Sequence, residues 1–187
     1  RLDASIAIAE GSGATGAFTI DVIKSPVGYS APPGKIGKPF IRKYHWPHSV
    51  VSQTNSNWPI YRYADVLLLL AEALNEQGKS TEALPYLNEV RHRAFGGGGD
   101  IAITDQSALR DIIAHERRVE LAFENKRWLD LVRTGKAIEV MTADGIRMKQ
   151  LDPGVNPNAY KVTQSRLLFP IPRREVEIAG LTQNPDY

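Results

Sequence analysis

The chain has 187 residues, of which 42% are hydrophobic and 24% charged, the composition of an ordinary globular protein. Its 23 basic and 21 acidic side chains leave a net charge of +2, which argues against an electrostatic binder of nucleic acid. It has no cysteine, so disulfides, thiol catalysis and thiolate metal sites are excluded. The first residue is Arg1 and no signal peptide opens the sequence, so we expect the natural N-terminus to lie upstream.

The first part of the chain is predicted to be irregular, with short strands. Candidate strands lie at residues 4–9, 17–23 and 40–44, and the glycines and prolines between them interrupt regular structure. From about residue 60 the sequence pattern becomes typical of helices. We therefore divide the chain into a loop-rich, partly β flank at 1–57 and a helical region at 58–187.

Two helices are predicted at the start of the helical region. The first covers residues 62–77 and ends at Gly78, the residue type that most often follows a helix. The second covers 80–95, with Ser80 as its N-cap and Pro85 early in the helix. This pair resembles one tetratricopeptide unit, because small residues at 71 and 83 flank the turn glycine at the spacing of that repeat.

Two more helices are predicted further along, at residues 107–124 and 126–142. Asn125 separates them, since asparagine tolerates the left-handed conformation better than most residues. Several prolines follow, which predicts an extended C-terminal tail whose apolar residues at 167–169 lie on the helices. The predicted fold class is mainly α, with tetratricopeptide-like helix pairs, a partly β N-terminal flank and this extended tail.

Two glutamates occupy positions on the third predicted helix where apolar side chains are expected. At about 100° per residue, Glu116 and Glu120 fall near the middle of the apolar face formed by Leu109, Ile113 and their neighbours. Two carboxylates on a packed face would cost several kcal/mol without cations, so we expect arginines to reach them from other helices. The candidate partners are Arg91, Arg93, Arg117 and Arg127.

A catalytic role for the same two glutamates is the alternative interpretation. Glycosidases use paired carboxylates at separations of about 5 to 9.5 Å, and carboxylates one helical turn apart approach that range. A helix face packed on other helices, however, offers no cleft for a sugar ring. We therefore interpret Glu116 and Glu120 as a structural ion-pair network, and no catalytic residue is assigned.

Aromatic and polar residues gather in the loop-rich sequence before the first long helix. Tyr44, Trp46, His48 and Trp58 are candidate ligand-binding residues, because flat rings stack on the apolar faces of sugars and loops carry binding residues. The alternative, which we favour, is that these rings dock the irregular segment on the helices. His45 and His48 are too few ligands for a metal site, so neither a metal nor another cofactor is expected.

Five ordered motifs in the chain resemble the C-terminal region of the SusD/RagB family. The resemblance covers residues 36–187, and asparagine at 125 replaces the glycine usual in the family. The motifs are YRYADVLLLLAEALNEQG at 61–78, ALPYLNEVRHRA at 83–94, ERRVELAFENKRWLDLVR at 116–133, LFPIP at 168–172 and LTQNPDY at 181–187.

This resemblance implies a non-enzymatic lipoprotein on the outer face of a Gram-negative outer membrane. Such proteins capture oligosaccharides or other nutrients for a SusC-type TonB-dependent transporter, and their tetratricopeptide-like helix pairs face that transporter. The lipid anchor and most sugar-contacting residues of the family would lie upstream of Arg1. A tetratricopeptide-type adaptor that binds a protein or peptide is the rival function, and a glycan-cleaving enzyme is the third.

Overall fold

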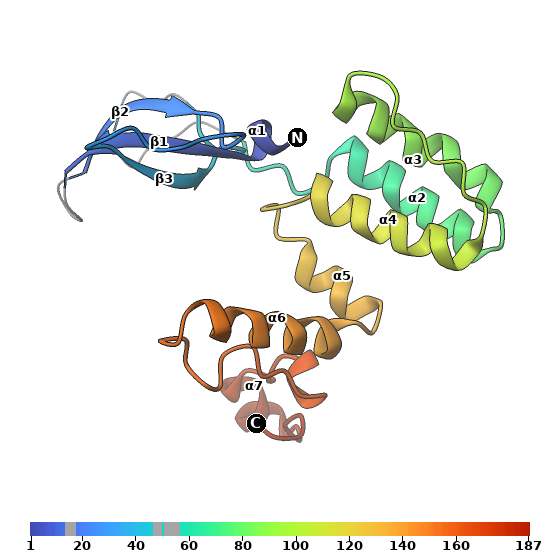
Figure 1. Ribbon diagram of the computed structural model, residues 1–187. Helices are drawn as coiled ribbons and strands as arrows, with labels where there is room; N and C mark the ends of the chain where they lie inside the picture. Colours follow the sequence, from blue (N-terminus) through green and yellow to red (C-terminus); the bar gives the residue numbers. More distant parts are fainter. Residues whose placement is uncertain (14–17, 47–49, 51–56) are drawn as a thin grey trace. The chain divides into compact units, whose positions relative to one another are not determined.

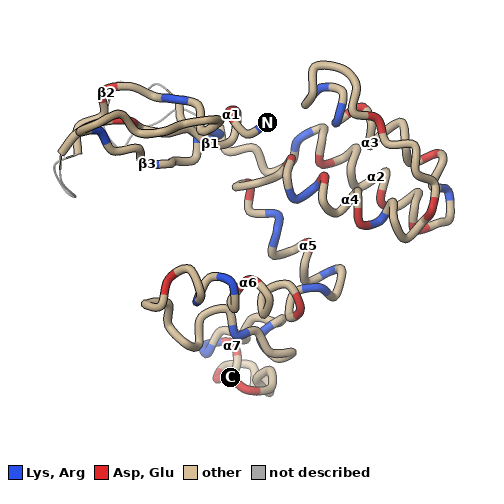
Figure 2. Tube along the Cα trace, viewed as in Figure 1, with Lys and Arg blue, Asp and Glu red and all other residues tan. Residues whose placement is uncertain are grey.

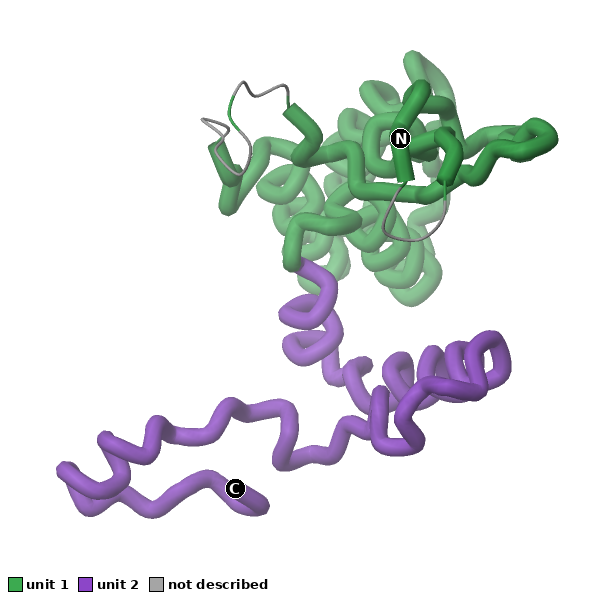
Figure 3. The backbone as a smooth tube through the Cα atoms, turned by 90° about the vertical axis from the view of Figure 1, so that its left-hand side faces the viewer, with its two compact units in different colours: residues 1–125 green, residues 126–187 purple. Residues whose placement is uncertain are grey.

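The computed structural model describes residues 1–13, 18–46, 50 and 57–187. The chain forms two compact units, Arg1–Asn125 and Lys126–Tyr187 (Figure 3). The predicted fold class is confirmed, because helices dominate and a small antiparallel sheet lies near the N-terminus (Figure 1). Within the described residues, no helix has both the length and the apolar character that crossing a bilayer requires.

The sheet has the strand order β2 (Thr19–Lys24), β1 (Ile6–Ser12) and β3 (Ile36–Ile41), and both outer strands run antiparallel to β1. The central strand is buried, whereas β2 is exposed along its length. The strand expected at 4–9 begins later because the residues before it are helical, and the strand expected at 40–44 lies earlier. The elements are α1 (Leu2–Ser5), β1 (Ile6–Ser12), β2 (Thr19–Lys24) and β3 (Ile36–Ile41).

The predicted tetratricopeptide-like pair is present as α2 (Tyr63–Glu76) and α3 (Ser80–Phe95). Gly78 turns the chain between them with a φ of 76°, a conformation that side chains other than glycine rarely adopt. Ala71 and Ala83 are fully buried in the seam, as expected. In Figure 1, α2 lies between α3 and α4 (Gln106–Glu120), which packs on its other side.

The role predicted for Ser80 is wrong, because Lys79 occupies the N-cap position and Ser80 is the first helical residue. The buried Ser80 hydroxyl instead donates a hydrogen bond to the Asn75 side-chain oxygen, 2.8 Å away. The Asn75 amide nitrogen donates in turn to the carbonyl of Gln106, at 2.9 Å. The serine thus supports a polar link between α2 and α4, since each buried polar group finds a partner.

The third predicted helix is shorter than expected, because α4 ends at Glu120 and not at 124. The chain then turns, with Phe123 and Asn125 both left-handed, at φ values of 68° and 58°. Asn125 was the expected break, but the backbone leaves the helix one turn earlier. The turn still holds Glu124 in a buried position beside the helix end.

The second unit contains two helices where one was predicted at 126–142. They are α5 (Arg127–Arg133) and α6 (Ala137–Leu151). Gly135 separates them with a φ of 69°, so the single helix is a wrong prediction. The Thr134 hydroxyl donates to the Asp130 carbonyl, 2.7 Å away, and satisfies a backbone group at the end of α5.

The tail of the second unit differs from a simple extended strap. It includes a 3₁₀ turn at Ser165–Leu167 and a short helix, α7 (Arg173–Ala179). Phe169 is 80% exposed, so the expectation that this apolar segment lies on helices is wrong for that residue. The Gln183 side chain instead forms hydrogen bonds of 2.8 Å with both the N–H and the carbonyl of Ile171. These bonds link the segment after α7 to the segment before it.

Candidate functional site

Three carboxylates lie buried at the C-terminal end of α4. Glu116 and Glu120 are one turn apart on the helix, and Glu124 follows in the turn after it. Their exposed fractions are 1%, 4% and 7%. Acidic and basic residues occur together along α4 and its neighbours (Figure 2). Charges this deeply buried need cations and hydrogen bonds around them.

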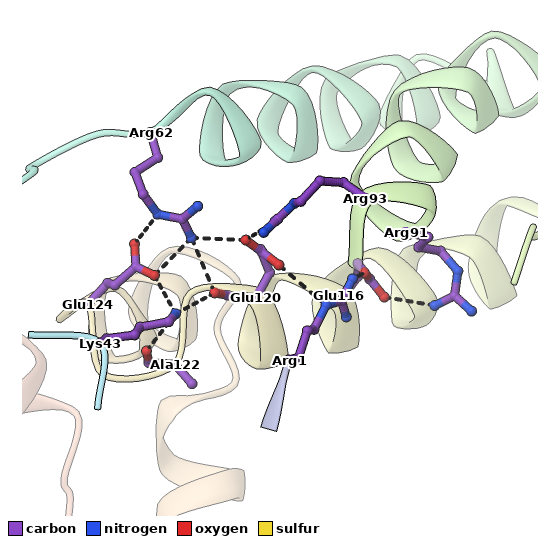
Figure 4. A network of polar contacts seen from close by, with 9 residues as sticks. All are labelled: Arg1, Lys43, Arg62, Arg91, Arg93, Glu116, Glu120, Ala122 and Glu124. Atoms are coloured by element: carbon purple, nitrogen blue, oxygen red, sulfur yellow. Dashed lines mark hydrogen bonds and ion pairs between the residues drawn. The ribbon is translucent and has the colours of Figure 1, made fainter. Parts of the chain in front are cut away.

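Glu116 and Glu120 receive those cations from outside their own helix (Figure 4). Arg91 of α3 contacts Glu116 with 2.8 Å between Nη1 and Oε2, and Arg1 binds the other carboxylate oxygen. Arg93 and Arg62 both bind Glu120, the latter at 3.0 Å. The pairs join α3 and the residue before α2 to α4, so they act as cross-links between helices.

Glu124 is held by two cations from the N-terminal side of the chain. Arg62 makes a forked contact, with Nε 2.7 Å from one carboxylate oxygen and Nη2 2.8 Å from the other. Lys43 also binds Glu124 and donates to the carbonyls of Glu120 and Ala122, at 2.6 and 3.0 Å (Figure 4). Lysine there satisfies carbonyls left open at the end of α4.

Sequence reasoning missed three of these cations, namely Arg1, Lys43 and Arg62. None lies on a neighbouring apolar helix face, so helical periodicity could not identify them. Arg117, offered as a partner for the glutamates, forms an ion pair with Asp65 of α2 at 2.9 Å. Arg127 begins α5 in the second unit, and its pairing with the glutamates stays a prediction.

The surroundings of Glu124 lower its pKa. Burial alone would raise the pKa of this carboxyl, but the hydrogen bonds and charges of Arg62 and Lys43 outweigh that effect and lower it below the ordinary 4.5. The folded chain therefore holds the carboxylate ionised at pH values where an unfolded chain would begin to bind a proton.

This shift predicts a pH dependence of stability. Because the pKa of Glu124 is lower in the folded chain, its contribution is complete above the ordinary value of 4.5 and is lost as the pH falls through the folded value. Glu124→Gln should destabilise the chain at about pH 7 and make progressively less difference towards about pH 3. Urea midpoints of both proteins across this range check the prediction, and a difference that grows on acidification would contradict it.

The contacts of the three glutamates indicate a structural role and not acid–base catalysis. A general acid or base needs a free carboxylate beside a cleft. Both oxygens of Glu116 contact arginine, and Glu120 contacts Arg62 and Arg93. The described residues also contain no group of three histidine, aspartate or glutamate side chains that could hold a metal ion.

Beside the network lies a hollow of about 430 Å³, which we call the Tyr44 pocket. Tyr44 and Trp46 line it, and the Tyr44 ring stacks on Trp58 with centroids 4.1 Å apart and planes inclined by 15°. Trp46 and Trp58 are 55% and 61% exposed. His48, the fourth candidate, lies outside the described residues. The pocket is lined by Ala4, Arg42, Lys43, Tyr44, His45, Trp46, Pro59, Arg62, Arg93, Glu120 and Glu124.

The pocket and the ion network share their walls. Lys43 precedes Tyr44 in the chain and binds the end of α4, so the network holds the residue next to the Tyr44 ring. The two sequence interpretations of the rings, ligand binding and docking on the helices, are compatible with this geometry. Tyr44 is half-buried against charged residues, whereas the tryptophans present exposed surface.

Comparison with curated proteins gives related sequences over much of the chain. SusD-like protein P2 of Formosa agariphila is 37% identical over 165 residues, covering 81% of this chain and 31% of that protein. SusD-like protein P38 of the same organism is 45% identical over 108 residues, covering 54% of this chain and 22% of that protein. The chain thus spans about a third or less of the length of these relatives.

Solved structures give the same assignment. A SusD homolog from Bacteroides thetaiotaomicron VPI-5482 aligns with a TM-score of 0.68 and 32% identity, covering 80% of this chain and 32% of the other. Surface glycan-binding protein A from Bacteroides thetaiotaomicron aligns with a TM-score of 0.58 and 28% identity, covering 90% and 32%. The model of the SusD family matches residues 16–187. The chain therefore belongs to the SusD family.

Proposed function

We propose that this chain is the C-terminal part of a non-enzymatic protein that captures glycans or other nutrients at the cell surface. The family match over residues 16–187 carries the proposal, because SusD family proteins are non-catalytic binding proteins. One similar structure is that of a surface glycan-binding protein. The commitment of the buried carboxylates to cations supports a role without catalysis.

We propose further that the protein works with a SusC-type TonB-dependent transporter in the outer membrane. A lipid anchor upstream of Arg1 would hold it at the cell surface. The tetratricopeptide-like pair α2–α3 supports a protein partner, because such pairs commonly present surfaces to other proteins. The adaptor function considered as a rival thus becomes one part of the proposed function. The division into a 1–57 flank and a 58–187 helical region belongs to the same proposal.

Calorimetry with a panel of oligosaccharides tests glycan capture. We expect the full-length protein to bind at least one member of the panel, and this chain alone to bind it weakly or not at all. Residual binding by the chain should fall in Trp46→Ala and Trp58→Ala, since stacked rings contribute apolar contact that hydrogen-bonding residues cannot replace. Trp128→Ala is the matched control, because it makes the same change at a tryptophan that does not line the Tyr44 pocket.

Two results would contradict the proposal. Release of reducing sugar by the purified chain would show an enzyme. Full-strength binding that survives both tryptophan substitutions would place the site elsewhere. For the transporter, we expect the full-length protein to co-purify with a SusC-type partner from outer membranes, and a transporter purified without it would contradict this part of the proposal.

A further inference from the structure

We propose that the Tyr44 pocket takes a sugar unit that carries an anionic group, either a carboxylate or a sulfate. The inference rests on the proposed glycan binding and adds the chemical class of the ligand. Its basis is the balance of charge in the wall. Four of the lining side chains are basic, namely Arg42, Lys43, Arg62 and Arg93, and two are acidic, Glu120 and Glu124.

The two acids are already neutralised within the wall. Glu124 is bound by Lys43 and by the forked contact from Arg62, and Glu120 is bound by Arg62 and by Arg93. An incoming carboxylate would therefore not face bare negative charge. The net charge of the lining side chains is therefore positive, and the positive charge lies where solvent reaches the pocket.

Arg42 and Arg93 have donors to spare. A guanidinium carries five N–H groups. The Arg42 side chain donates a hydrogen bond from Nη1 to the Asp3 carbonyl at 3.3 Å, and the residue is exposed. Arg93 contacts Glu120 through one nitrogen, and its side chain is 59% exposed. The planar fork of arginine matches the paired oxygens of a carboxylate or sulfate.

The same pocket offers a surface for the sugar ring. Trp46 lines it and is 55% exposed, so part of an indole ring, a group that stacks on sugars, reaches solvent there. The Tyr44 hydroxyl is buried without a hydrogen-bond partner in the described part of the chain. Burial and the charge of Glu124 raise the pKa of Tyr44, so the group remains a protonated donor. A sugar hydroxyl or ring oxygen would satisfy it, as buried polar groups require.

The test is a titration followed by NMR on the indole N–H signals of the three tryptophans. The probes are trigalacturonate, galactose 6-sulfate and the neutral galactotriose, at equal ionic strength. We expect the Trp46 signal to move, with trigalacturonate or galactose 6-sulfate binding at least about fivefold more tightly than galactotriose. Trp128, which does not line the pocket, serves as the internal reference. If trigalacturonate binds more tightly than galactose 6-sulfate, the preferred group is a carboxylate; if the order is reversed, it is a sulfate.

Single substitutions then assign the preference to the two arginines. Arg42→Gln should reduce the preference for the acidic sugar by about threefold to fivefold, because it weakens acidic-sugar binding more than galactotriose binding. Arg93→Gln should act likewise, but it also touches Glu120, so Arg42→Gln is the decisive variant. Arg147→Gln is the matched control, because Arg147 is 62% exposed and pairs with Asp144 on α6.

Each other outcome overturns the inference in a recognisable way. Equal or tighter binding of galactotriose would remove the anionic preference while leaving the proposed function intact. An equal shift of Trp46 by sodium sulfate alone would reduce the pocket to a general anion site. A further outcome is that neither this chain nor the full-length protein binds any of the three sugars, while the full-length protein binds other glycans. That result would overturn the inference and leave the proposed function intact. Failure of the full-length protein with every glycan would end both proposals.

Discussion

Replacing Glu116 by alanine is expected to lower the free energy of unfolding by about 3–5 kcal/mol. The carboxylate is 1% exposed and binds Arg91 and Arg1, whose side chains are only 17% and 15% exposed. Its removal takes this partner from both guanidinium groups, although Arg1 still contacts Glu120 at 3.3 Å. The cost comes chiefly from leaving the buried Arg91 charge without its carboxylate, and to a lesser degree from the weaker pairing of Arg1.

Urea or thermal unfolding measures this loss. Glu139→Ala is the matched control, because the same change is made at a carboxylate that is 71% exposed and pairs with Lys136 on the surface of α6. It should alter stability by less than about 1 kcal/mol. A double variant that also converts Arg91 to methionine should recover part of the loss. An unchanged denaturant midpoint for Glu116→Ala would contradict the burial of the pair.

Two of the three carboxylates of the network, Glu116 and Glu120, could be predicted from the sequence, but Glu124 was missed and the cations were predicted only in part. Helical periodicity places Glu116 and Glu120 on one packed face, which is a local property of α4. Arg91 and Arg93 were within reach of the same reasoning, because they lie on a neighbouring helix. Lys43 lies in a turn and Arg62 is the residue before α2. Only the tertiary fold brings both side chains to α4.

Helix boundaries show the same limit. The pair α2–α3 was located to within about one residue, because Gly78 is a strong local signal and both helices are long and periodic. The break at Gly135, which has a φ of 69°, was missed, although a glycine after a helix end is the same kind of local signal as Gly78. The end of α4 at Glu120 is set by the cations that hold the following turn, which no local propensity encodes.

The network also explains how a mostly helical scaffold can position a loop-borne pocket. Lys43 and Arg62 flank the segment that carries Tyr44, Trp46 and Trp58, and both bind Glu124. These two contacts hold Lys43 beside Tyr44 without using the aromatic ring. Binding residues can then lie on loops while rigid elements set their position. Loss of Glu124 should therefore affect ligand binding as well as stability.

Ala83→Phe is expected to destabilise the first unit by about 1–3 kcal/mol, because it overpacks the seam between α2 and α3. Ala83 is fully buried in the cluster that includes Leu68, Ala71 and Leu87, with no exposed surface into which a ring could turn. The two helices must separate or rotate to admit six more ring atoms.

Ala73→Phe is the control for this prediction, since Ala73 lies on the exposed face of the same helix pair. It adds the same ring and should leave the denaturant midpoint nearly unchanged. Because α2 also packs on α4, a shift of α2 in Ala83→Phe should reach the glutamates on α4. We therefore expect the Ala83 variant to weaken the effect of a second change at Glu116, so that the two losses are less than additive. Equal midpoints for the Ala83 and Ala73 variants would show that the seam is not closely packed.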